Sequence, residues 1–143
     1  MGKYDALKLE NQLCFPLYAA SRAIIRRYTP LLAEFGLTYT QYITMMVLWE
    51  TREISVRDLG NKLFLDSGTL TPLLKSLEKK GYVTRRRSKE DERVLLVGIT
   101  GEGDALRDRA LSVPERMAGC ADLPPDDAAT LYRLLYQLMN TLH

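Results

Sequence analysis

The residues of this sequence best able to do covalent chemistry at neutral pH are two cysteines, Cys14 and Cys120. They lie far apart and do not form a disulfide framework, and the single histidine, His143, is too few for a zinc site or a Cys/His catalytic pair. Pro16 suits the first turn of a helix, which places Cys14 at or just before a helix N-terminus, where free N–H groups and the helix dipole favour a thiolate. On position alone, however, a lone cysteine between two apolar residues is more often buried and unreactive.

Basic residues form a second group, suited to binding. Between residues 85 and 93 the chain carries Arg85, Arg86, Arg87, Lys89 and Arg93. Most charge runs are solvated turns, but the position of this one directly after an amphipathic helix favours contact with nucleic acid. The net charge of the chain is only +2, so its basic character is local. This fits a specific regulator better than a protein that coats nucleic acid by charge alone.

The helix before this basic run is indicated by its leucine spacing. Leucines at 70, 73, 74 and 77 follow the i, i+3, i+4, i+7 pattern, Gly81 ends the helix, and Asp66 or Ser67 is its candidate N-cap. Pro72 leaves two starts open: near Thr69, or earlier with one backbone hydrogen bond missing. The polar face carries hydroxyls and lysines, which suit phosphates and base edges.

The segments on either side of this helix complete a DNA-reading unit. Upstream, Ser55 and Asp58 resemble a capping box at the start of a short helix, and residues 64–66 form a turn. Downstream, residues 82–84 and 94–99 are strand-like around a polar turn, which predicts a β-hairpin. Two helices and a hairpin in this order predict a winged helix-turn-helix. Residues 52–54 could add a short edge strand.

Helices are expected at both ends of the chain. The apolar spacing from Leu17 continues for about five turns until Gly36, and Thr40 is the expected cap of a second helix, with Tyr39 just outside it at the edge of the core. After Thr100, residues 101–103 break the strand, and Pro114 interrupts the helical stripe that follows.

A last helix begins at residues 122–127, and its apolar residues wrap more than one face, so it should bury surface against its own domain and a second subunit. Such helical arms indicate a symmetric dimer that reads two half-sites of a pseudo-palindromic operator.

The expected fold is therefore mainly α with a small β-wing. Residues 1–143 form one domain, with residues 1–36 and 102–143 as helical dimerisation arms and residues 37–101 as the winged helix-turn-helix. No stretch has the length of a membrane span and the N-terminus lacks a signal-peptide core, which predicts a cytoplasmic protein. No cofactor is expected.

The hairpin and its exit, residues 91–100 (DERVLLVGIT), resemble the D-x-R-x5-[LI]-T signature of the MarR family of winged helix-turn-helix regulators. Residues 8–15, 37–42 and 65–74 resemble the OhrR branch, which senses organic hydroperoxides. The resemblance covers nearly the whole chain. It implies a dimeric repressor in which oxidation of Cys14 releases the operator, with Tyr28 and Tyr39 hydrogen-bonded to the Cys14 thiolate.

The resemblance and the residue types together name the DNA-contacting residues. Arg93 should enter the minor groove at the wing tip, while hydroxyls of the reading helix lie in the major groove. The candidate DNA-binding residues are Ser67, Gly68, Thr69, Thr71, Pro72, Lys75, Arg85, Arg86, Arg87, Asp91 and Arg93.

The spacing of Cys14 and Tyr28 limits how the sensor residues implied by the resemblance can meet. If Cys14 and Tyr28 share one straight helix, 14 residues separate them by about 21 Å at about 1.5 Å per residue, so they cannot touch within one subunit. The tyrosines would then come from the other subunit. Some OhrR-like proteins have a single sensing cysteine and form mixed disulfides with small thiols, and others close an intersubunit disulfide with a second cysteine in the C-terminal region. No sharp motif surrounds Cys120, but its position favours a resolving cysteine over an unrelated thiol.

Three other functions compete with the peroxide sensor. A MarR-type regulator gated by a small phenolic or anionic ligand would keep the DNA-binding half without needing Cys14. A thiol peroxidase would need a recycling base or a CxxC motif, and the chain offers neither. A winged helix used only for protein contacts would not need the arginines at 85–93.

Overall fold

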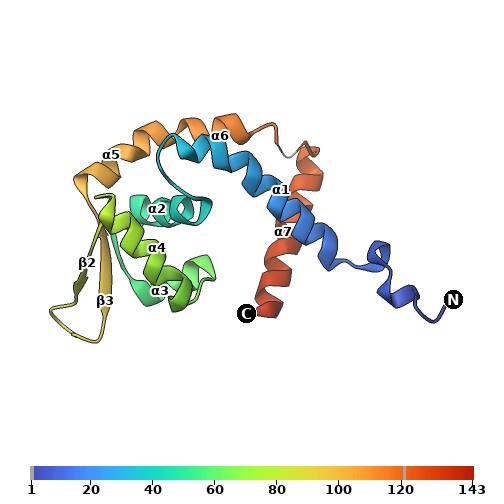
Figure 1. Ribbon diagram of the computed structural model, residues 1–143, viewed down its shortest axis with the longest axis horizontal. Coiled ribbons are helices and arrows are strands. Elements are labelled where there is room, and N and C mark those ends of the chain that lie inside the picture. The colour runs from blue at the N-terminus through green and yellow to red at the C-terminus, as the bar shows by residue number, and fades with distance from the viewer. Residues whose placement is uncertain (1, 121) are drawn as a thin grey trace.

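The computed structural model describes residues 2–120 and 122–143; Met1 and Ala121 lie outside the described residues. The chain is mainly helical with one small sheet, which confirms the expected fold class (Figure 1). Its elements are two 3-10 turns (Asp5–Leu7 and Leu9–Asn11), α1 (Cys14–Ala33), α2 (Tyr39–Thr51), β1 (Glu53–Ser55), α3 (Val56–Leu63), α4 (Ser67–Lys79), β2 (Val83–Arg87), β3 (Leu95–Ile99), α5 (Gly101–Ala110), α6 (Ser112–Met117) and α7 (Pro125–Leu142).

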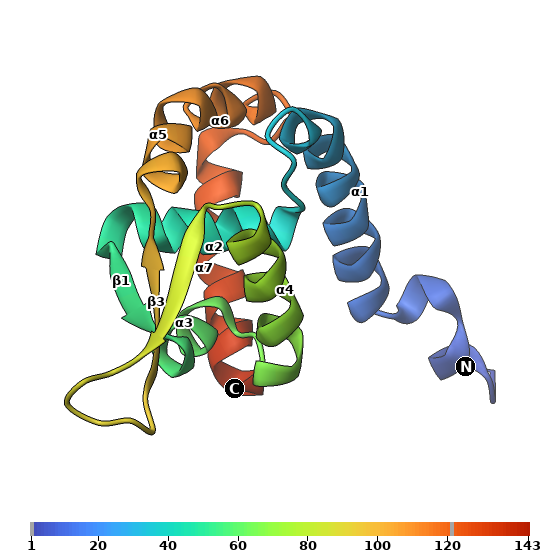
Figure 2. The ribbon, with the colours of Figure 1, turned by 60° about the vertical axis from the view of Figure 1, so that its left-hand side comes forward.

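The sheet is antiparallel with strand order β1-β3-β2. Strands β2 and β3 form the predicted hairpin, with Val83 opposite Ile99 and Arg87 opposite Leu95, and this hairpin projects beyond the helices (Figure 2). The predicted edge strand exists one residue later than expected, at residues 53–55. The wing and the N-terminus lie at opposite ends of the molecule (Figure 1).

The core lies among α2, α3, α4 and the sheet, and the C-terminal end of α1 and parts of α5 and α6 also contribute to it. All four leucines of the predicted stripe on α4 are buried, which confirms the amphipathic helix. Asp66 is its N-cap, and the helix begins at Ser67 and continues through Pro72, so the later start near Thr69 is wrong. Gly36 and Gly81, expected to end α1 and α4, have positive φ values of 67° and 84°, a conformation that glycine adopts without strain.

Two helix starts differ from the expectation. Helix α2 begins at Tyr39 and its N-cap is Thr38, not Thr40, because Gln41 completes a capping box with Thr38. Residues 101–103 do more than break the strand: they start α5, whose N-cap Thr100 accepts a hydrogen bond from the Gly103 amide. The helical stripe divides at Leu111, so that Pro114 falls in the first turn of α6, where a proline is tolerated.

Helix α7 is poorly covered for a long apolar helix. None of its residues is buried in the single chain, although it carries exposed leucines and tyrosines along much of its length. The exposed large side chains are Leu131, Tyr132, Leu134, Tyr136, Leu138 and Leu142. An apolar helix without cover in one chain is typical of an interface between chains.

Candidate DNA-reading surface and redox site

The reading surface of α4 is fixed at its N-terminus by Asp66. The carboxylate accepts a hydrogen bond from the backbone N–H of Thr69 at 2.8 Å. Hydrogen bonds from Thr69 hold the pKa of Asp66 below its usual value, which keeps the cap ionised. The predicted contact residues that follow this cap on α4 are all exposed: Ser67, Gly68, Thr69, Thr71, Pro72 and Lys75.

Asp91 and Arg93 form an ion pair at the wing tip. The Arg93 guanidinium donates to both carboxylate oxygens of Asp91, at 3.1 Å from Nε and 3.3 Å from Nη2, while its side chain is 90% exposed. This pairing lowers the pKa of Asp91. The D-x-R motif thus holds an exposed guanidinium in one direction, as a residue that enters a DNA groove requires.

A cleft of about 880 Å³ separates the wing tip from the start of α4. Arg93 and Asp91 line one side, and Ser67 and Thr71 line the other. Two polar residues of α3 also line it and were not foreseen: Arg57 and Asn61. Their spacing of four residues places them on one helix face, a signal that the sequence contained.

The remaining predicted arginines do not gather with Arg93. Arg85 is half-buried and pairs with Glu78 of α4 at 3.1 Å. Arg86 pairs with Glu53 of β1 at 3.0 Å, because successive strand residues point to opposite faces. Among Arg85, Arg86 and Arg87, only Arg87 has no ion pair within the described residues. A direct contact of each with DNA stays a prediction.

Cys14 is the first residue of α1, which confirms its predicted place at a helix N-terminus. Its thiol is free and exposed in the single chain, so the burial that its apolar neighbours favoured is not seen there. Tyr28 lies on the same helix, so the two residues are about 21 Å apart along the helix axis at about 1.5 Å per residue. Cys14 and Tyr28 therefore share one helix, as the argument for an intersubunit sensor requires.

Three tyrosine rings gather where α1 meets α2. The ring centroid of Tyr28 lies 4.9 Å from that of Tyr39 and 5.9 Å from that of Tyr42. Burial, followed by the proximity of Tyr28, raises the pKa of both Tyr39 and Tyr42, so their hydroxyls stay protonated donors. Tyr42 was not among the residues predicted for the redox site; its i, i+3 relation to Tyr39 was the signal that it belongs to the cluster.

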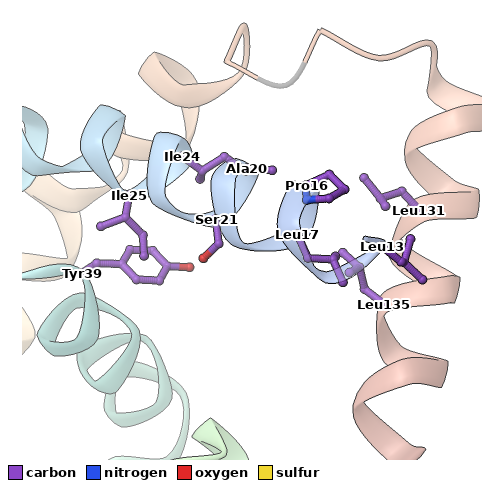
Figure 3. Close-up of a pocket in the computed structure, with 10 residues that line it drawn as sticks. All are labelled: Leu13, Pro16, Leu17, Ala20, Ser21, Ile24, Ile25, Tyr39, Leu131 and Leu135. Atoms are coloured by element: carbon purple, nitrogen blue, oxygen red, sulfur yellow. The ribbon is translucent and has the colours of Figure 1, made fainter. Parts of the chain in front are cut away.

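An apolar groove of about 580 Å³ runs along α1 from the Cys14 end to this cluster. Figure 3 shows side chains of α1, Tyr39 of α2, and Leu131 and Leu135 of α7 pointing into it, with the Tyr39 hydroxyl directed toward Ser21. The groove thus lies between the arm helices and joins the two parts of the proposed sensor.

Cys120 lies at the other end of α1. Its half-buried thiol contacts the Met117 sulfur at 3.8 Å. An ion pair of 3.1 Å between Arg116 and Glu34 joins α6 to the residue after the C-terminal end of α1. The structure therefore does not bring Cys14 and Cys120 together within one chain.

Comparison with known proteins decides the family. A family profile described as "Transcriptional regulator SarA/Rot" matches residues 26–109. The organic hydroperoxide resistance transcriptional regulator of Bacillus subtilis is 45% identical over 142 residues, covering 99% of this chain and 97% of that protein. The chain belongs to the MarR family of winged helix-turn-helix regulators, in its OhrR-like branch.

Solved structures agree with this OhrR-like assignment. Reduced AbfR bound to DNA matches with a TM-score of 0.79 and 36% identity over 99% of both chains. A disulfide form of AbfR, a protein of Staphylococcus epidermidis, matches with a TM-score of 0.66, 36% identity and 96% coverage of both chains. The chain is therefore a DNA-binding transcriptional regulator and not an enzyme. Within the described residues, no helix has the length and apolarity needed to cross a membrane.

Proposed function

We propose that this OhrR-like protein is a cytoplasmic, dimeric repressor that releases its operator when an organic hydroperoxide oxidises Cys14. One observation carries the proposal: Cys14 is an exposed thiol at the first residue of α1, in a chain similar over nearly its whole length to an organic hydroperoxide resistance regulator. The free N–H groups of the first helical turn favour a thiolate at that position. Residues 1–36 and 102–143 act as the dimerisation arms, and residues 37–101 read DNA.

Two features support the proposed dimer. Helix α7 has no buried residue in one chain, and its leucines need cover. Cys14 and the tyrosine cluster lie at different ends of the groove along α1, so antiparallel packing of two α1 helices around a two-fold axis would bring Cys14 of each subunit to Tyr28 and Tyr39 of the other.

The first chemical step is the attack of the Cys14 thiolate on a peroxide oxygen. The O–O bond breaks, the alcohol oxygen leaves with the bonding electron pair and takes a proton, and the sulfur becomes a sulfenic acid. The hydroxyls of Tyr28 and Tyr39 supply hydrogen bonds to the thiolate.

The second step is resolution by Cys120 of the other subunit. Its thiolate attacks the sulfenic sulfur, the S–O bond breaks, and the hydroxide leaves as water with the thiol proton. A disulfide requires Cα atoms within about 7 Å, so a longer separation between Cys120 and the Cys14 of the other subunit would require α6 to move. Such a movement of the arms would also move the reading helices.

A gel-shift titration on operator DNA tests the proposal. The parent should bind DNA and release it after a stoichiometric dose of tert-butyl hydroperoxide, whereas Cys14→Ser should bind and ignore the oxidant. Cys120→Ser should form the sulfenic acid, detected by mass, without a covalent dimer on a non-reducing gel. A Cys14→Ser protein that is still released by hydroperoxide overturns the assignment in favour of the ligand-gated regulator. A parent that yields only a small-thiol adduct removes Cys120 from the resolving role.

A further inference from the structure

The turn between α1 and α2 is bound to the C-terminal end of the reading helix by several polar contacts. The Lys80 ammonium donates to the Gly36 carbonyl oxygen, and the Tyr82 hydroxyl donates to the Phe35 carbonyl oxygen at 3.4 Å. Both donors lie within three residues of the end of α4, and both acceptors lie in the turn between α1 and α2. The segment that carries Tyr39 and the segment that carries the reading helix are thus joined outside the apolar core.

Gln41 is at the centre of these contacts. Its side chain is only 5% exposed and its amide makes three hydrogen bonds. Its Oε1 accepts from the Thr38 amide at 3.1 Å and from the Lys80 ammonium at 3.1 Å. Its Nε2 donates to the Ser76 hydroxyl of α4 at 3.0 Å. A buried amide with all these partners is stiff, because breaking any bond leaves a buried polar group unpaired.

We infer that Gln41 is a positioning residue that transmits a movement of Tyr39 to α4. Gln41 completes the capping box at the start of α2, where Tyr39 is the first helical residue. The same Gln41 side chain also binds Ser76 of α4, so one side chain positions both the sensor tyrosine and the reading helix. Ser76 and Ser67 are nine residues apart on α4, so about 14 Å of helix at about 1.5 Å per residue separates the held point from the first DNA-contacting residue. A small tilt at Ser76 therefore becomes a larger displacement where the helix meets DNA.

This inference rests on the proposed function, because it takes Tyr39 as part of the sensor. It adds a route between the two sites: the tyrosine cluster, the first turn of α2, the Gln41 amide and the Ser76 hydroxyl. Oxidation at the sensor can change DNA affinity through this route only if these hydrogen bonds differ between the reduced and the oxidised protein.

The substitution Ser76→Ala tests the route, because it removes one partner of Gln41 and leaves the Thr38–Gln41 capping box intact. Ser76→Thr keeps the hydroxyl and should restore the parent behaviour. Ser112→Ala is the matched control: it also removes one hydrogen bond of a half-buried serine, to the Arg109 carbonyl oxygen, away from this route. Gln41→Met removes all three amide bonds with little change in length; if this variant does not fold, the two Ser76 variants decide alone.

The quantity to measure is the ratio of operator Kd for the peroxide-treated protein to that for the reduced protein. Ser76→Ala should lower this ratio by roughly 2- to 30-fold, as mutations along a coupling route do, with the rate of Cys14 sulfenic acid formation unchanged. A ratio equal to that of the parent overturns the inference. So does an equal rise in both Kd values, which would mean that Ser76 only holds α4 in place. If the parent itself is not released by hydroperoxide, the proposed function fails, and the inference fails with it.

Discussion

Arg85 of the wing donates two hydrogen bonds to Glu78 of the reading helix, so this residue pair connects the wing to α4. The guanidinium Nη2 donates to Oε1 at 3.1 Å, and the backbone N–H donates to Oε2 at 3.2 Å. Side chain and backbone of one strand residue thus bind the same carboxylate of α4, which fixes the angle between the hairpin and the helix.

We predict that this contact weakens in acid. The hydrogen bond from the Arg85 side chain lowers the pKa of Glu78 below 4.5 in the folded protein. The folded-state pKa is depressed, so the stabilisation is complete above the unfolded-state value and is lost as pH falls through the folded-state value. Glu78→Gln should therefore be less stable than the parent in urea at about pH 7, and the difference should shrink by about pH 3. A constant difference across this range would assign the effect to packing.

Arg93→Ala should weaken operator binding by about 1–3 kcal/mol and reduce the salt slope by about one, because it removes the guanidinium that we expect to enter the minor groove. Fluorescence anisotropy at several salt concentrations measures both quantities. Arg107→Ala, which removes an exposed arginine of α5, is the matched control and should change neither. Unchanged affinity and slope in a folded Arg93→Ala protein would remove the wing tip from the DNA interface.

Leu135→Glu should cost several kcal/mol of coupled folding and association, because it puts a charge into the groove between the arm helices. Gln137→Glu adds the same charge at an exposed position of α7 and should have little effect. Sedimentation equilibrium distinguishes the two. A Leu135→Glu protein that is a folded, DNA-binding monomer would contradict the proposal that folding and DNA binding need the dimer.

Tyr39→Phe and Tyr28→Phe should each slow the reaction of Cys14 with hydroperoxide by about 10-fold or more, because each removes a hydroxyl donor to a charged sulfur. DNA binding of the reduced protein should remain. Stopped-flow trapping of the sulfenic acid gives the rate, and Tyr4→Phe, at an exposed residue near the N-terminus, serves as control. Unchanged rates would leave the cluster a packing feature.

Much of the fold could be predicted because local patterns determine it. The leucine spacing on α4 indicates a helix, and the aliphatic and β-branched residues of β3 indicate a strand. The start of α2 was missed because Thr38 and Thr40 compete for the same role, and only the reach of Gln41 back to Thr38 decides between them. Glycines at 101 and 103 predicted a break, yet a Cβ at Gly103 would lie 2.2 Å from the Tyr82 carbonyl oxygen, so tertiary packing requires that glycine within a helix.

The site was less predictable than the fold. Composition places several arginines in the wing but cannot tell which of them is used to hold the protein together. Which arginines form internal ion pairs depends on the alternating side-chain directions along β2. It also depends on Glu78 of α4 and Glu53 of β1, which pair with Arg85 and Arg86. The tyrosine cluster likewise depends on the angle between α1 and α2, which no local pattern specifies.

The length of α1 has a consequence for dimers assembled from two different chains. Cys14 and Tyr28 of one chain are too far apart to meet, so in the proposed dimer each sensor is assembled from two chains. A mixed dimer of a Cys14→Ser chain and a Tyr28→Phe chain would then concentrate both defects in one sensor and leave the other with an intact cysteine and intact tyrosines. A purified mixed dimer of this kind should therefore still react with hydroperoxide at its one intact sensor. A mixed dimer in which both chains are altered at the same residue would have no intact sensor.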